Sequence, residues 1–119
     1  MNVPGARLLD TAYTVSILPI DNIYRNYLIE VRRVPGTEMW EVTHLGAFLN
    51  ADMKWDLRSE WWSDFEGDNS WEEWARTHRF SFLEAIQKAR DVAPFVEVNG
   101  RSATEALQRS LQVQEEKSF

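Results

Sequence analysis

The chain has 119 residues, 13 basic and 19 acidic side chains, a net charge of -6 and no cysteine. This length suits a single domain, which buries enough apolar surface to fold unaided. The lack of cysteine excludes disulfides and thiolate metal sites, and the acidic balance disfavours direct binding to nucleic acid. The sequence shows neither a secretion signal nor an apolar run that could cross a membrane, so we expect a cytoplasmic protein without membrane contact.

The first half of the chain alternates apolar and polar residues with a period close to two, which is typical of half-buried strands. Four segments show the pattern: 13–17, 27–31, 40–43 and 53–57. Pro35-Gly36 lies between the second and third segments, with proline and glycine in the order that a tight turn favours. We therefore predict an antiparallel meander of three to four strands.

The second half repeats a helix-start pattern, Ser-x-x-Glu, in which serine and glutamate can each satisfy a free backbone N-H at the helix start. The pairs are Ser70 with Glu73, Ser81 with Glu84, and Ser102 with Glu105. Pro94 ends the second helix, Asn99-Gly100 makes a turn, and we expect the third helix over 102–113. The predicted fold is α+β, a meander followed by two to three helices packed on one face, in one domain of residues 1–113 with 114–119 as a disordered tail.

The window from Trp55 to Trp74 holds five of the six tryptophans, and its seven acids against one base give the same net charge, -6, as the whole chain. Much of it has a structural explanation. We expect Trp40, Trp55, Trp71 and Trp74 in the core, because their spacing fits one face of a strand or helix. Glu72 and Glu73 follow Ser70, where carboxylates suit the first turn of a helix.

The middle of that window is a candidate contact segment. Trp61 and Trp62 are adjacent, so burial on one side cannot easily hide both. We predict a partner-binding segment in which the aromatic residues are anchors and the acids form a polar rim. Its residues are Glu60, Trp61, Trp62, Asp64, Phe65, Glu66 and Asp68. The expected partner is a host or self protein with a basic, partly apolar surface.

The chemical motifs of enzymes are weak in this sequence, and we predict no catalytic residue, no metal and no cofactor. Asp64, Glu66 and Asp68 have the spacing of the first calcium ligands of an EF-hand. The loop would have Asn69 where that motif needs glycine and Ala75 where it needs glutamate. The two histidines suggest no triad, with His44 expected at the core or its rim and His78 at a helix end.

Three other functions stay open at this point. The acids could imitate a phosphate backbone and inhibit a nucleic-acid-binding protein, although seven carboxylates are few and the window is very aromatic. The acidic loop could serve a small metal-dependent enzyme. The chain could also be an oligomer-forming structural piece.

Three stretches of the chain carry a resemblance to a known group of proteins. They are 13–19 (YTVSILP), 71–74 (WEEW) and 93–105 (APFVEVNGRSATE). Together they resemble small accessory proteins encoded by actinobacterial phages of the mycobacteriophage type. The resemblance implies a phage protein that binds or inhibits a component of its bacterial host, and it carries over no functional motif.

Overall fold

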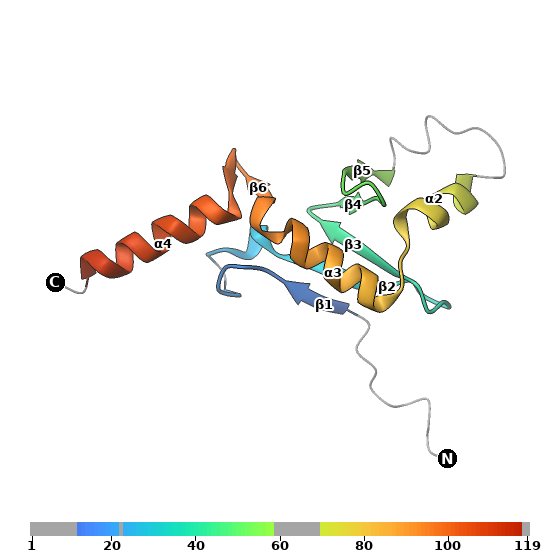
Figure 1. Ribbon diagram of the computed structural model, residues 1–119, viewed down its shortest axis with the longest axis horizontal. Coiled ribbons are helices and arrows are strands. Elements are labelled where there is room, and N and C mark those ends of the chain that lie inside the picture. The colour runs from blue at the N-terminus through green and yellow to red at the C-terminus, as the bar shows by residue number, and fades with distance from the viewer. Residues whose placement is uncertain (1–11, 22, 59–69, 118–119) are drawn as a thin grey trace, which may run out of the picture.

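The computed structural model describes residues 12–21, 23–58 and 70–117. Within them, five strands form an antiparallel sheet in the order β1-β2-β3-β4-β5, and helices follow (Figure 1). The α+β class predicted from the sequence is therefore confirmed. The elements are β1 (Ala12–Val15), η2 (Arg25–Tyr27), β2 (Ile29–Arg33), β3 (Trp40–His44), β4 (Ala47–Leu49), β5 (Trp55–Leu57), α2 (Ser70–His78), α3 (Phe82–Val92), η3 (Ala93–Phe95), β6 (Glu97–Val98), β7 (Arg101–Ser102) and α4 (Ala103–Lys117).

The connection between β2 and β3 is the turn that Pro35-Gly36 predicts. The N-H of Thr37 donates to the carbonyl of Val34 at 3.1 Å, and Gly36 has a φ of 77°. A positive φ at this position strongly favours glycine. The turn sets a register in which Arg33 pairs with Trp40.

The sheet has one strand more than the sequence predicts, because β4 follows β3 through a two-residue hairpin. Leu45 and Gly46 both have positive φ, 47° and 85°, as a type I′ turn requires. The three residues of β4 are all apolar, so they lack the alternation that marks the other strands. Met53 was expected in the last strand but lies before it, in a turn with a φ of 64°.

One face of the sheet carries the core. Ile29, Val31 and Val42 are fully buried there, and burial of each such side chain stabilises the fold by about 2 kcal/mol. The helix α3 contacts β1, β2 and β3, and its Ala85 and Ala89 are fully buried. These small side chains let the helix lie close to the strands.

The helix α2 meets the sheet through a different set of side chains. Glu41 alternates with Trp40 and Val42 along β3, so its side chain leaves the strand on the other side. Trp74 of α2 contacts Glu41 there. The chain then passes the start of β3, where Phe80 pairs with Trp40 through two backbone hydrogen bonds of 2.8 and 2.9 Å.

The C-terminal part consists of the β6–β7 hairpin and α4. Asn99 and Gly100 form the predicted turn with φ values of 53° and 79°. Ser102 then caps α4, because its Oγ accepts from the N-H of Glu105 at 3.2 Å. The helix runs to Lys117, past the end predicted at Val113, and projects from the body at the end away from α2 (Figure 1). No helix in the described ranges has the length and apolarity needed to span a membrane.

Candidate functional site

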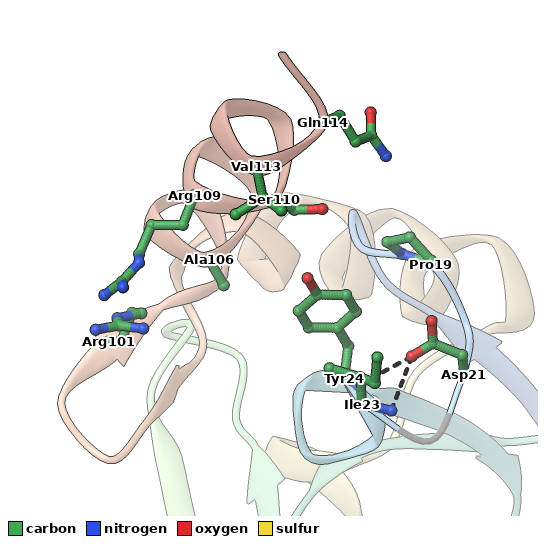
Figure 2. A pocket seen from close by; sticks show the side chains of 10 residues that line it. All are labelled: Pro19, Asp21, Ile23, Tyr24, Arg101, Ala106, Arg109, Ser110, Val113 and Gln114. Atoms are coloured by element: carbon green, nitrogen blue, oxygen red, sulfur yellow. Dashed lines mark hydrogen bonds between the residues drawn. The ribbon is translucent and has the colours of Figure 1, made fainter. Parts of the chain in front are cut away.

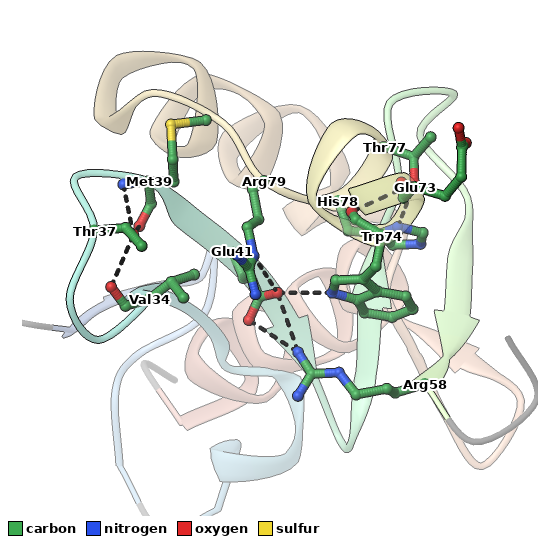
Figure 3. A network of polar contacts seen from close by, with 10 residues as sticks. All are labelled: Val34, Thr37, Met39, Glu41, Arg58, Glu73, Trp74, Thr77, His78 and Arg79. Carbon is green, nitrogen blue, oxygen red and sulfur yellow. Dashed lines mark hydrogen bonds and ion pairs between the residues drawn. The ribbon is translucent and has the colours of Figure 1, made fainter. Parts of the chain in front are cut away.

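A buried carboxylate is the centre of a polar cluster on β3. Glu41, on β3, is only 7 % exposed. Its Oε2 accepts from Nε1 of Trp74 at 2.8 Å, and both carboxylate oxygens accept from Nη2 of Arg58, at 3.2 and 3.1 Å. Nε of Arg79 lies 3.5 Å from the same Oε2. Figure 3 shows the two guanidinium groups and the indole converging on the carboxylate.

Two aromatic rings flank Arg58 in this cluster. The Arg58 guanidinium lies over the ring of Phe48, 4.4 Å from its centroid, and over the ring of Trp74 at 4.9 Å. The rings of Phe48 and Trp74 meet edge to face at 5.3 Å. Ion pairs gain strength when low-dielectric groups exclude water. We define Glu41, Arg58, Trp74 and Arg79 as the Glu41 cluster.

The Glu41 cluster holds the chain on both sides of the predicted contact segment. Arg58 directly precedes residues 59–69, and Trp74 lies in α2, which begins at Ser70. One carboxylate in the centre of the sheet therefore binds a residue before the segment and a residue after it. Removing Arg58 would leave the buried charge of Glu41 poorly compensated, and removing Glu41 would leave the buried N-H of Trp74 without its acceptor.

The seven predicted contact residues, from Glu60 to Asp68, all lie outside the described residues. Of the tryptophans expected in the core, Trp40 and Trp74 are buried, and Trp55 is half-buried against the core. The side chain of Trp71 lies outside the described part. Glu72 and Glu73 are in the first turn of α2 as predicted.

Three side chains join the end of α2 to the sheet. His78 is 0 % exposed, and its ring stacks on Trp74 with centroids 3.7 Å apart and planes 2° apart. Its Nε2 lies 2.8 Å from Oδ2 of Asp56, and its Nδ1 lies 2.7 Å from Oγ1 of Thr77. Oδ2 of Asp56 also accepts from Nδ2 of Asn50 at 3.0 Å.

The row of Thr77, His78 and Asp56 has the residue types of a nucleophile, a base and an orienting acid. Thr77 Oγ1 lies 2.7 Å from the carbonyl oxygen of Glu73 and 2.7 Å from Nδ1 of His78, and its single hydroxyl proton can serve only one of them. Nε2 of His78 donates to the Asp56 carboxylate, which can only accept. With a fully buried ring and a hydroxyl held against a carbonyl of its own helix, this arrangement holds α2 to the sheet and is poorly placed for attack on a substrate.

The exposed face of α2 carries an ion pair between Glu73 and Arg76. Glu73 accepts two hydrogen bonds from Arg76. The hydrogen bond and charge of Glu73 raise the pKa of the Arg76 guanidinium above its usual value. Arg76 therefore keeps its charge at every physiological pH, and the pair acts as a surface feature of the helix.

No group of three or more potential ligands is placed to hold a metal ion within the ranges 12–21, 23–58 and 70–117. The acids of the EF-hand-like spacing, Asp64, Glu66 and Asp68, lie outside those ranges.

A cavity of about 480 Å³ lies between the loop after β1 and α4. Figure 2 shows Arg101 and Arg109 on one side of it and Asp21 on the other, with the ring of Tyr24 between them. Oδ1 of Asp21 accepts from the N-H groups of Ile23 and Tyr24 at 2.9 and 3.1 Å. The charged groups of the cavity carry both signs and its carboxylate serves the loop, so the cavity favours no one class of ligand.

The Glu41 cluster was not foreseen from the sequence. Glu41 stands between two core residues of β3, and alternation alone predicts an exposed position for it. A signal was present in Arg58, the only base in the window from Trp55 to Trp74. An isolated base among acids and aromatic residues can mark an internal ion pair.

No family model matches this chain, and neither a curated protein nor a solved structure does. The resemblance to phage accessory proteins stays a prediction from the sequence.

Proposed function

We propose that the protein is a non-enzymatic protein-binding module whose contact element is the segment from Glu60 to Asp68. The supporting observation is that Glu41 binds both Arg58 and Trp74, so the chain is attached to the sheet on either side of this segment. Contact segments carried by a rigid scaffold lose less freedom on binding than freely hanging ones.

The chemistry of the segment defines its partner. Trp61, Trp62 and Phe65 supply the large aromatic surface that dominates protein contacts. Glu60, Asp64, Glu66 and Asp68 supply negative charge that speeds encounter with a basic surface. The partner is thus a protein with a basic, partly apolar patch. The resemblance to phage proteins favours a component of a bacterial host, which the module would bind or inhibit in the cytoplasm.

The first test is capture of proteins from a bacterial lysate by the immobilised chain, followed by their identification by mass spectrometry. The double variant Trp61→Ala/Trp62→Ala is expected to lose the captured protein. Leu83→Ala is the matched control, because Leu83 is 78 % exposed on α3 and lies outside the segment. A thermal midpoint close to wild type in both variants would show that the fold is intact.

Two results would contradict the proposal. The double variant could capture the same proteins as wild type, or it could unfold well below the wild-type midpoint, which would assign the two tryptophans to the core. With a captured partner in hand, the association rate should fall steeply as salt is added, because the acids act through long-range attraction.

A further inference from the structure

We propose that the protein has a second contact surface, an apolar groove over β4 and β5 that binds a basic amphipathic helix of a partner protein. The groove has a volume of about 420 Å³. It is lined by His44, Leu45, Ala47, Trp55, Phe95, Val96 and Glu97.

The floor of the groove belongs to the face of the sheet that carries the core. Ala47 pairs with both His44 and Leu57, and paired residues share a face. His44 follows Val42 at a spacing of two, so these side chains continue the face that α3 covers over β1, β2 and β3. Trp55 is half-buried there, with its ring 5.8 Å from that of His44.

The width of the sheet leaves room for a second helix. Neighbouring strands lie about 4.8 Å apart, so five strands span about 19 Å, and packed helices lie about 10 Å apart. One place is taken by α3, over β1 to β3. The groove lies at the other place, over β4 and β5. Ala47 is as small as Ala85 and Ala89 of α3, and a small residue permits close approach of a helix.

Two exposed apolar side chains line the groove. Leu45 is 64 % and Phe95 is 72 % exposed, an arrangement that often marks a contact surface. Leu45 also has a φ of 47°, a conformation that favours glycine or asparagine and strains a branched residue. The turn between β3 and β4 requires this conformation, so the feature that favours a contact is the exposed leucine found there in place of asparagine or glycine.

The negative charge of the groove determines which kind of helix can bind there. Glu97 is an exposed carboxylate of the lining, and it makes no ion pair with any residue in the described ranges. A second copy of the chain would bring its own Glu97 to this surface, and two chains with a net charge of -6 each repel one another. A helix with apolar anchors on one face and lysine or arginine beside them complements both features.

The probe is a labelled helical peptide of about 14 residues, with leucine on one face and lysine on the other. A peptide with glutamate in place of lysine is its control. Fluorescence anisotropy should show binding of the lysine peptide to the full chain and little binding of the glutamate peptide. Glu97→Gln should weaken binding and reduce its dependence on salt.

Two substitutions in the lining sharpen the test. Leu45→Asn and Phe95→Ala should each weaken binding about tenfold, the usual effect of truncating an apolar anchor. Leu83→Ala, equally exposed but on α3, should leave it unchanged. Leu45→Asn should also raise the thermal midpoint, since Asn-Gly suits this turn. Weaker binding by a more stable protein cannot result from unfolding.

Three results would overturn the proposal: equal binding of the glutamate peptide, unchanged affinity in both lining variants, or self-association that Phe95→Ala abolishes. The last would assign the groove to a second copy. Trp61→Ala/Trp62→Ala should bind the peptide like wild type, so the groove and the segment from Glu60 to Asp68 can fail independently.

Discussion

Nε1 of Trp74 donates a 2.8 Å hydrogen bond to Oε2 of Glu41, although the two residues lie 33 positions apart in the chain. Trp74 is fully buried and Glu41 nearly so. This bond brings the helix after residues 59–69 to the middle of the sheet.

Replacing Glu41 by glutamine should destabilise the protein by about 3 kcal/mol, because it keeps the shape but removes the charge shared by Arg58 and Arg79. Urea denaturation followed by tryptophan fluorescence measures this. Glu30→Gln is the control, because Glu30 is a more exposed carboxylate on the neighbouring strand and pairs with Arg32. A surface pair of that kind contributes below about 1 kcal/mol. Equal losses in the two variants would show that burial of Glu41 has no special weight.

Trp74→Phe keeps an aromatic ring against Phe48 and His78 but removes the indole N-H. We expect a loss of about 2 kcal/mol, because a charged acceptor loses a donor and the ring is smaller. Combined with Glu41→Gln, the cost should be smaller than the sum of the two single losses, since both remove the same bond. Strict additivity in the same urea assay would mean that the two residues act independently.

His78→Phe retains a flat ring on Trp74 and removes both ring nitrogens. Asp56 and Thr77 each lose a partner, so we expect a loss of about 2 kcal/mol in chemical denaturation. His44→Phe provides the comparison, because His44 is half-buried and makes one bond, to the carbonyl of Asn26 at 2.8 Å. Its replacement should cost less. If His44→Phe lost more stability than His78→Phe, the contacts of His44 on β3 would be the stronger ones.

Ser81→Ala and Ser102→Ala should each cost about 1 kcal/mol, the usual value for a lost serine cap. The Oγ of each accepts from the backbone N-H three residues on. The caps belong to different helices, so the double variant should show the sum of the two losses. Ser110→Ala, inside α4, is the control and should be neutral or slightly stabilising. A cap variant that behaves like Ser110→Ala would remove the capping interpretation.

Features that depend on near neighbours were predictable from the sequence. The caps at Ser81 and Ser102 need only the glutamates three residues later. The turns at Pro35-Gly36 and Asn99-Gly100 need only their own backbone preferences. Alternation also identified β2 and β3, because the apolar residues of each strand lie on one face. These local rules were enough to predict the α+β class.

Features that depend on distant parts of the chain were not predictable. With its three apolar residues, β4 has no period to detect, and only its pairing with β3 and β5 defines it. Glu41 is buried because α2 packs on it, which the residues around Glu41 do not reveal. Composition did identify a candidate contact segment. The contacts of Arg58 and Trp74, on either side of that segment, with Glu41 are visible only in the structure.

The backbone pairing of Phe80 with Trp40 also affects how the protein avoids aggregation. The strand β4 pairs only with the end of β3, at Thr43 and His44, so the start of β3 lies beyond its reach. An open strand edge is a template for pairing with another chain. Phe80 fills both hydrogen-bonding positions of Trp40, so the link between α2 and α3 also protects the sheet from growing by addition of a foreign strand at this point.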